Sequence, residues 1–406
     1  MFSQIANLPS ALKQYGIITG NYWAFTLTDG ALRMLVVLYF HQLGYGALAI
    51  AMLFVFYELF GVITNLIGGW LGAHLGLNKT MNIGLGLQVV ALAMLCAPSD
   101  WLSVSYVMLA QALSGVAKDL NKMSAKSAIK YLVPEGDNQQ SQLYKWIAIL
   151  TGSKNALKGV GFFLGGLLLT LLGFVGALVA LIMLLTIAWI ISLVYLEGDI
   201  GKAKNKPKFK ALLSKSRAIN LLSAARFCLF AARDVWFVVA LPVYLASQFN
   251  WPHWWVSGFM ALWVIAYGVV QSQAPKITGK SLVSNDAIKK AFYWGGVLAC
   301  VTLLLACLMQ LNIAVNTTLI VGLFIFGAAF AINSSLQSYL IVSLAKSDGV
   351  SLDVGFYYMA NAAGRLVGTV LSGFMYKVYG LQACLWVSAS LLLLVCLITQ
   401  RLTKQS

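Results

Sequence analysis

The sequence predicts an all-α membrane protein with twelve transmembrane helices in two related six-helix halves. Composition is the first observation behind this prediction, because 60% of the 406 residues are hydrophobic and only 10% are charged, a balance foreign to soluble globular domains. The second is that apolar runs of about twenty or more residues recur along the chain, each long enough to cross a hydrocarbon core of about 30 Å as a helix.

The predicted spans follow one another with short connections. They cover residues 17–43, 47–75, 79–97, 101–130, 143–171, 174–196, 217–245, 253–275, 287–310, 313–344, 349–376 and 381–401. Several exceed the length that a span needs, which indicates tilt or extra turns beyond the membrane. Residues 1–15 contain no separate apolar core with a cleavage site, so we expect the first span itself to direct insertion.

Basic residues outside the spans lie on alternate loops. The formal net charge of +16 is compatible with nucleic-acid binding, but this distribution is the positive-inside pattern of membrane proteins, so we expect no nucleic-acid partner. The loops after the sixth and eighth spans hold Lys202, Lys204, Lys206, Lys208, Lys210, Lys215, Lys276, Lys280, Lys289 and Lys290. We therefore expect both termini in the cytoplasm and, in a bacterium, an inner-membrane location. The basic residues of the central loop have two possible explanations, which are membrane topology alone and the binding of anionic lipid.

An internal repeat relates the two halves. A shift of 207 positions lays the fifth span on the eleventh and the second on the eighth, and a slightly smaller shift brings Asp29 close to Asp234. The matched pairs in the fifth and eleventh spans are Lys158 with Arg365, Gly161 with Gly368, Gly166 with Gly373, and Gly173 with Gly380. The sequence therefore predicts a bundle at 1–196, a basic cytoplasmic linker at 197–216 and a second bundle at 217–406, the organisation of the major facilitator superfamily.

Cationic side chains outnumber anionic ones inside the predicted spans. Ten of these cations are Arg33, Lys118, Lys122, Lys126, Lys145, Lys154, Lys158, Arg226, Arg233 and Arg365, and four of the anions are Asp29, Glu58, Asp119 and Asp234. A charge at the bilayer centre costs about 2.5–3.5 kcal/mol even on the most lenient scale. The surplus therefore predicts a water-accessible cavity that binds an anion with several negative charges.

Depth and spacing distinguish these cations. Arg33, Lys158, Arg233 and Arg365 fall near the middle of their spans, too deep to reach water. Lys126 and Lys145 lie towards the cytoplasmic ends, where a flexible stem can carry the ammonium group to the interface. The spacing also predicts one stripe of lysines at 118, 122 and 126 and another at 154 and 158.

The remaining polar residues receive separate interpretations. Arginine suits bidentate binding of phosphate or arsenate oxygens, and Asn121, Asn155 and Asn361 are placed to serve hydroxyl or carboxylate oxygens. Asp29 precedes Arg33 by one helical turn, which predicts an ion pair within the helix, and Asp234 is expected to pair with Arg226 or with a neighbouring helix. Asp119, within the first lysine stripe, is a further candidate for an ion pair or for proton coupling.

Glu58 is the leading candidate for proton coupling. It lies in mid-span with no cation nearby in the sequence, and a carboxyl group in such a place can carry protons. A hydrogen-bonded structural role is the alternative interpretation. His41 and His74 offer no stronger candidate.

Four stretches resemble a particular family within that superfamily, the organoarsenical efflux permeases of the ArsJ type. They are Thr28–Leu35, Gln111–Lys126, Thr151–Gly159 and Ala231–Phe237. The resemblance covers essentially the whole chain and implies export of 1-arseno-3-phosphoglycerate, a product that glyceraldehyde-3-phosphate dehydrogenase makes from arsenate. It also implies a functional link to that enzyme and resistance to arsenate. We expect a monomer.

A substrate with two anionic ends fits two cationic clusters. The hypothesis is that Arg33, Lys118, Lys122, Lys154 and Lys158 bind one end and that Arg226, Arg233 and Arg365 bind the other, with binding across the halves driving alternating access. An antiporter of phosphorylated metabolites or inorganic phosphate needs much the same cavity and stays the nearest alternative.

Other classes of protein find little support in the sequence. The three histidines are widely separated, and no carboxylate pair, nucleophile with a base, or metal-ligand spacing occurs. The six cysteines form no CxxC motif and fall in apolar spans. The sequence thus predicts no enzyme, no metal site and no cofactor, and a receptor or scaffold would leave the buried cations unexplained.

Overall fold

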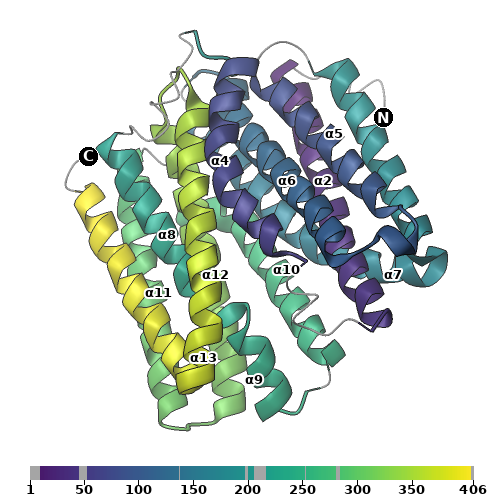
Figure 1. Ribbon diagram of the computed structural model, residues 1–406. Helices are drawn as coiled ribbons and strands as arrows, with labels where there is room; N and C mark the ends of the chain where they lie inside the picture. The colour runs from purple at the N-terminus through teal and green to yellow at the C-terminus, as the bar shows by residue number, and fades with distance from the viewer. Residues whose placement is uncertain are drawn as a thin grey trace. The chain divides into compact units, whose positions relative to one another are not determined.

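A computed structural model describes residues 10–44, 53–136, 138–196, 200–204, 216–251, 253–279 and 284–403 of the protein. These residues form helices joined by short connections, and no β-strand occurs among them (Figure 1). Most of the predicted basic linker lies outside the described residues, including Lys206, Lys208, Lys210 and Lys215, and so does Lys280. The same is true of residues 1–9 and 404–406, the two ends whose location the charge pattern predicts.

The apolar segments form the helices. In chain order these are α2 (Ser10–Gln42), α4 (Val55–Leu75), α5 (Leu77–Leu95), α6 (Val104–Leu132), α7 (Gln139–Tyr195), α8 (Arg217–Phe237), α9 (Ala240–Gln248), α10 (His253–Thr278), α11 (Ser284–Gln310), α12 (Val315–Leu344) and α13 (Val350–Thr403). Each predicted span overlaps one of these helices within the described ranges. The prediction of an all-α membrane fold is therefore confirmed.

The long helices α7 and α13 each contain two predicted spans and turn at one glycine. The turn lies at Gly173 in α7 (φ 67°, ψ 179°) and at Gly380 in α13 (φ 78°, ψ −174°). A positive φ of this kind is easy for glycine and unfavourable for other residues. The two glycines are one of the pairs that the internal repeat matches, so the two halves reverse direction at equivalent positions.

The seventh predicted span is interrupted, with α8 ending at Phe237 and α9 beginning at Ala240. Pro242 explains the break, because proline has no N–H to donate four residues back and its ring clashes with that carbonyl group. The backbone N–H of Ala240 instead donates to Oγ of Ser372, at 3.1 Å.

Several helices are long and apolar enough to cross a membrane by composition alone. Among the described residues these are α2, α7, α8 with α9, α11, α12 and α13. Helix α6 falls short because Lys118, Asp119 and Lys122 interrupt its apolar sequence. Charged residues inside a membrane-spanning helix are unfavourable unless they serve a function, so these three indicate a functional role for α6.

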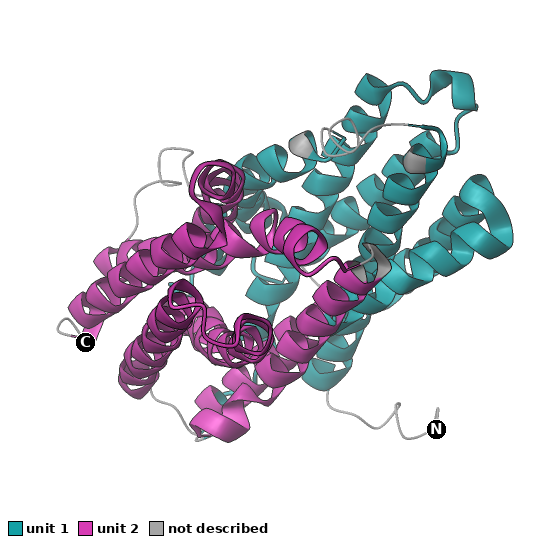
Figure 2. Cartoon of the chain, turned by 90° about the horizontal axis from the view of Figure 1, so that it is seen from below, with its two compact units in different colours: residues 1–139, 156–214, 345–359 teal, residues 140–155, 215–344, 360–406 magenta. Residues whose placement is uncertain are grey.

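The chain divides into two compact units (Figure 2). Unit 1 comprises residues 1–139, 156–214 and 345–359, and unit 2 comprises residues 140–155, 215–344 and 360–406. The first turns of α13 thus belong to unit 1, where Oγ of Ser351 donates to the carbonyl oxygen of Gly69 at 2.7 Å. The first turns of α7 belong to unit 2, where the hydroxyl of Tyr339 donates to Oε1 of Gln140 at 2.6 Å.

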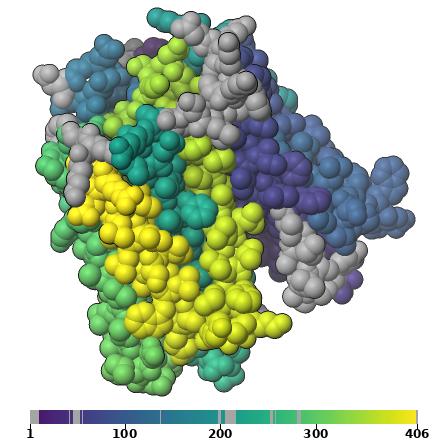
Figure 3. Space-filling model, turned by 60° about the vertical axis from the view of Figure 1, so that its left-hand side comes forward, coloured from purple at the N-terminus to yellow at the C-terminus, as the bar shows by residue number. Residues whose placement is uncertain are grey.

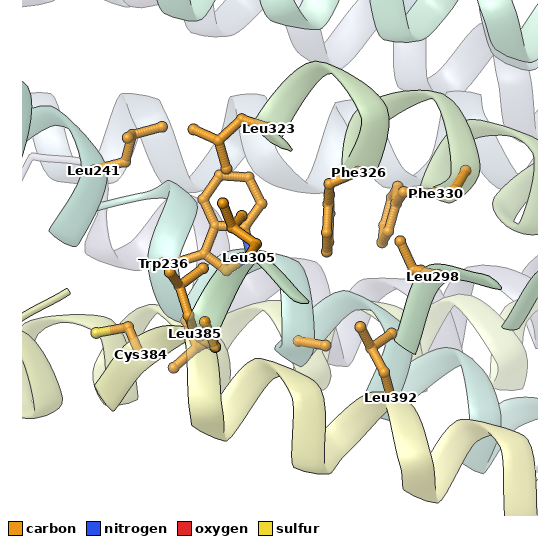
Figure 4. Packing of buried hydrophobic residues seen from close by; sticks show 14 of the residues in the cluster. Trp236, Leu241, Leu298, Leu305, Leu323, Phe326, Phe330, Cys384, Leu385 and Leu392 are labelled. Atoms are coloured by element: carbon orange, nitrogen blue, oxygen red, sulfur yellow. The ribbon is translucent and has the colours of Figure 1, made fainter. Parts of the chain in front are cut away.

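Apolar packing holds each unit together. In unit 1, α6 packs against both α4 and α5. In unit 2, α8, α11, α12 and the second part of α13 share a core in which Trp236 meets Phe326 edge to face, with ring centroids 5.0 Å apart (Figure 4). Because these helices carry the charged residues, the core fixes where the charges lie.

Apolar side chains also cover the outer surface, as a membrane protein requires. The second part of α13, yellow in Figure 3, exposes Leu393 and Leu394 to 47% each and Leu397 to 57%. Such a face is stable in contact with lipid chains.

Candidate functional site

Three helices of unit 1 supply a cluster of charged side chains. Helix α2 contributes Asp29 and Arg33, α4 contributes Glu58, and α6 contributes Lys118, Asp119, Lys122 and Lys126.

Arg33 pairs with Glu58 across α2 and α4. Nη2 of Arg33 lies 2.9 Å from Oε1 of Glu58, and the two side chains are 21% and 30% exposed. The predicted ion pair between Arg33 and Asp29 within one helix is therefore wrong, and Glu58, which has no cation nearby in the sequence, meets one from α2 in space. The physical reason is that α4 brings a carboxylate to Arg33 from another span, a contact that spacing along one helix cannot reveal.

Tyr57 of α4 connects the charges of unit 1. Its hydroxyl donates to Oδ1 of Asp29 at 2.6 Å. Its ring centroid lies 4.1 Å from Cζ of Arg33 and 3.8 Å from Nζ of Lys118. The negative face of an aromatic ring attracts cations, so one buried side chain holds an anion at its hydroxyl and two cations at its ring.

Asp119 lies between two lysines of α6. Its Oδ1 is 2.6 Å from Nζ of Lys122, and its Oδ2 is 3.6 Å from Nζ of Lys118. The residue is 1% exposed. A carboxylate so deeply buried stays charged only beside cations of this kind.

Lys126 is buried, so the expectation that its stem reaches the membrane interface is wrong. It is 3% exposed, and its Nζ donates to the hydroxyl of Tyr358 at 2.5 Å. The Tyr358 ring also lies 4.9 Å from Nζ of Lys122. Tyr358 belongs to the part of α13 that lies in unit 1, 232 positions from Lys126, which is why the sequence of α6 gave no sign of it. Lys145 is exposed, as the same expectation requires.

The lysine stripe of α7 divides between the two units. Lys158 is half-buried in unit 1, with Nζ 5.8 Å from the ring centroid of Phe162. Lys154 and Asn155 belong to unit 2, where Nδ2 of Asn155 donates to Oε1 of Gln271 at 2.7 Å. Lys154 and Lys158, one helical turn apart on α7, therefore belong to different compact units.

Asp234 joins two arginines in unit 2. Its Oδ1 lies 2.6 Å from Nε of Arg233, and its Oδ2 lies 3.3 Å from Nε of Arg365. The aspartate side chain is 0% exposed, whereas those of the arginines are 14% and 31% exposed. Of the two partners left open by the sequence, the neighbouring helix is correct, because Arg365 comes from α13.

Arg226 is held by α12. Its Nη1 donates to the carbonyl oxygen and to Oγ of Ser334 at 3.1 and 3.0 Å, and its Nη2 donates to Oγ of Ser338 at 3.4 Å. Tyr267 and Gln271 of α10 also donate to Oγ of Ser334, at 3.2 and 3.3 Å. With an exposed fraction of 2%, Arg226 is placed to order α8, α10 and α12.

Arg233 lies among three phenylalanine rings. The ring centroids of Phe230, Phe330 and Phe237 are 4.7, 5.4 and 5.8 Å from its Cζ. Its Nε is bound to Asp234, and its outer amino groups make no hydrogen bond to any described residue. The two amino groups of an arginine form a planar fork whose geometry suits two oxygens of a phosphate-like anion.

Two of the three candidate asparagines are buried without full hydrogen bonding. Asn121 is 0% and Asn361 is 7% exposed, and Nδ2 of each finds no hydrogen-bond partner among the described residues. A buried amide without a partner is unfavourable. Asn155, by contrast, is bonded to Gln271.

Positive charge exceeds negative charge in both units. Of the charges singled out in the predicted spans, unit 1 holds five cations (Arg33, Lys118, Lys122, Lys126 and Lys158) and three anions (Asp29, Glu58 and Asp119), which leaves a surplus of two. Unit 2 holds four cations away from the exposed Lys145 (Lys154, Arg226, Arg233 and Arg365) and one anion (Asp234), which leaves three. In both units, the cations of this group therefore outnumber its anions.

Tyr57, Tyr358 and Ser334 each contact a predicted charge directly, although the sequence did not single them out. A signal existed for one of them. Helix α12 carries an unusually polar run that is 0–1% exposed, made up of Asn333, Ser334, Ser335, Gln337 and Ser338. Polar residues buried in a span indicate a hydrogen-bonding partner on another helix, in this case Arg226. The two tyrosines are not distinguishable by type from packing residues.

A helical membrane protein with two repeated halves and charged residues inside its spans is a multi-pass transporter. The chain belongs to the Major Facilitator Superfamily, whose sequence profile matches residues 18–288 and 282–405. Transporters of this superfamily bind small molecules within the bilayer, move them by alternating access, and are generally not enzymes. Among curated proteins, none matches the sequence significantly.

Solved structures of transporters share the fold over nearly the full chain. A bacterial homologue of the iron transporter ferroportin, in an outward-facing state, has a TM-score of 0.74 at 13% identity and covers 96% of this chain and 99% of its own. The human organic anion transporter MFSD10 (TETRAN) has a TM-score of 0.75 at 16% identity, with 97% and 100% covered. The E. coli fucose:proton symporter has a TM-score of 0.74 at 11% identity, with 97% and 99% covered. At these identities the likeness extends to the fold alone.

Proposed function

We propose that this transporter exports an organic anion that carries a phosphate and an arsenate group, namely 1-arseno-3-phosphoglycerate, and thereby confers resistance to arsenate. The observation that carries the proposal is that, among the charged residues singled out in the predicted spans, the cations outnumber the anions in each unit. Such a surplus inside membrane spans is stable only beside water and an anionic ligand. The identity of the ligand rests on the resemblance to the ArsJ-type permeases.

The charge of this substrate suits the two surpluses. A phosphate monoester carries about −1.5 to −2 at pH 7, and an arsenate group at the other end adds a comparable charge. The surplus is two cations in unit 1 and three in unit 2. These numbers support a substrate with two anionic groups, one for the cluster of each unit. A substrate with a single charge would leave most of the surplus in place.

The residues proposed to bind substrate are the ones predicted from the sequence, and their contacts differ from one residue to the next. They are Arg33, Lys118, Lys122, Lys154, Lys158, Arg226, Arg233, Arg365, Asn121, Asn155 and Asn361. Arg33, Lys118 and Arg233 are the strongest candidates for direct contact, because each is partly exposed and rests on an aromatic ring. Arg226 would act mainly by holding its helices in place, since Ser334 and Ser338 already accept its hydrogen bonds.

The cellular setting is part of the same proposal. The substrate would come from a cytoplasmic glyceraldehyde-3-phosphate dehydrogenase that uses arsenate. The protein would act as a monomer in the inner membrane, with both termini in the cytoplasm as the distribution of basic residues predicts. The nearest alternative is an antiporter of phosphorylated metabolites or inorganic phosphate. It would use the same cations and differ only in what is released outside.

A transport assay separates these two functions. Inverted membrane vesicles that contain the protein should accumulate arsenic only when the dehydrogenase, glyceraldehyde 3-phosphate, NAD and arsenate are all supplied. Omitting any one component, or using vesicles without the transporter, should abolish uptake. Uptake of 3-phosphoglycerate at the same rate would refute the proposed substrate and favour the alternative.

A further inference from the structure

We propose that Asp119 is an internal competitor of the transported anion: it holds Lys118 and Lys122 when no substrate is bound, and it gives up Lys118 first when an oxyanion arrives. Asp119 is thus a positioning residue, which touches the cations and not the substrate. The inference rests on the proposed function only in placing an anion at these lysines, whichever anion is exported.

The two oxygens of Asp119 are held unequally. Oδ1 lies 2.6 Å from Nζ of Lys122, a short charge-assisted hydrogen bond. Oδ2 lies 3.6 Å from Nζ of Lys118, beyond hydrogen-bond length, and it has no hydrogen-bond partner among the described residues although it is buried. The pair with Lys118 is therefore the weaker one.

Lys118 has a second weak attachment. Its Nζ lies 3.8 Å from the ring centroid of Tyr57, and its side chain is 15% exposed. Neither the ring nor the distant Oδ2 gives the ammonium group a close anionic acceptor. A phosphate-like oxygen would bind it at about 2.8 Å, so Lys118 can turn to a ligand with little loss.

Gly61 of α4 fixes the place of the carboxylate. A Cβ atom at this position would lie 2.8 Å from Oδ2 of Asp119. Only glycine leaves enough room there for the carboxylate to sit against α4. Nζ of Lys118 would lie 3.9 Å from the same Cβ atom, so the carboxylate and this ammonium group lie side by side against α4 at Gly61.

A fixed negative charge beside the lysines has two consequences for transport. It lowers the affinity of the site for an anion, because the anion must displace the carboxylate and is repelled by it. It also speeds release, because the carboxylate takes the lysines back as the anion leaves. A carrier needs moderate affinity and fast release, because a ligand that binds one conformational state too tightly keeps the protein in that state.

Binding measurements on the purified full-length protein test this role, with 3-phosphoglycerate as a stable probe. Asp119→Asn should bind the probe about tenfold more tightly, the usual size of the effect of one neighbouring charge, and should transport more slowly. Asp119→Glu keeps the charge and should stay close to the wild type in affinity. Asp286→Asn, which removes an exposed carboxylate from the first turn of α11, is the matched control and should change neither property.

Weaker or unchanged binding in folded, inserted Asp119→Asn would overturn the proposal. The wild-type protein provides a test that does not depend on a variant. Carbodiimide labelling of Asp119, read by mass spectrometry, should increase when 3-phosphoglycerate is bound, because the lysines then turn to the ligand. Unchanged or reduced labelling would also overturn it. If the wild-type protein exports no arsenic while Asp119→Asn still binds 3-phosphoglycerate more tightly, the proposed substrate is refuted and the internal competitor is supported.

Discussion

Nη2 of Arg33 lies 2.9 Å from Oε1 of Glu58, an ion pair that ties α2 to α4 in unit 1. The same arginine rests on the ring of Tyr57, whose hydroxyl is bonded to Asp29. The candidate proton carrier suggested by the sequence is therefore also the counter-ion of the first arginine. Any change in the charge of Glu58 acts directly on Arg33.

A double-mutant cycle should show this dependence. Glu58→Gln and Arg33→Gln each leave one partly exposed charge without its partner, and the double variant removes both. We expect a coupling free energy of about 1–2 kcal/mol, since the pair is partly exposed. Thermal unfolding of the four proteins in the same detergent measures it. Additive effects would show that the pair contributes nothing.

The matched cations Lys158 and Arg365 should both be essential for transport. Changing either to Gln removes one charge from the surplus of its own unit, and we expect transport to fall at least tenfold, as when about 1.4 kcal/mol or more of binding is lost. Vesicle uptake measures the rate, and surface labelling checks that the protein is inserted. The exposed Lys145 provides the control, because Lys145→Gln should transport normally. Wild-type transport in both Lys158→Gln and Arg365→Gln would refute the cationic site.

The hydroxyl of Tyr358 should stabilise unit 1. Tyr358→Phe removes the acceptor of the Lys126 hydrogen bond and keeps the ring beside Lys122 and Lys126. We expect a loss of about 2 kcal/mol in the free energy of unfolding, typical of a hydrogen bond to a charged group. Tyr379→Phe, at a position that is 64% exposed, should leave the unfolding temperature unchanged. Equal stability of the two variants would contradict the role given to Tyr358.

The two glycine turns should respond alike to substitution. Gly173→Ala and Gly380→Ala each force a side chain into a left-handed backbone conformation, with an expected loss of about 1–2 kcal/mol. Gly296→Ala is a suitable control, because Gly296 has no positive φ and no atom within 4 Å of an added Cβ. Thermal unfolding compares the three. A neutral effect at only one of the two turns would argue against their equivalence.

The fold was predictable from the sequence because its signals are local and repeated. Apolar length gives the spans, and the recurrence of Gly173 at Gly380 gives the two halves. The residues of the candidate site were also visible, since a lysine or arginine in a span is conspicuous by type alone.

Pairing between the charges was largely not predictable. Spacing along α2 favoured Asp29 as the partner of Arg33, and only the packing of α4 against α2 brings Glu58 closer. Lys126 looked accessible by its position in α6, yet Tyr358 covers it from a distant part of the sequence. Such contacts depend on how separate helices meet, and a single sequence does not encode that in any local pattern.

The assignment of residues 345–359 to unit 1 has a consequence for biosynthesis. The hydrogen bond from Ser351 to Gly69, and that from Tyr131 to the carbonyl oxygen of Ser347, join segments that leave the ribosome far apart in time. Helices α2 to α6 enter the membrane first and then wait, without these partners, while most of the remaining chain is made. The first unit is therefore completed only late in translation. A protein truncated before residue 345 would lack the residues that complete this unit.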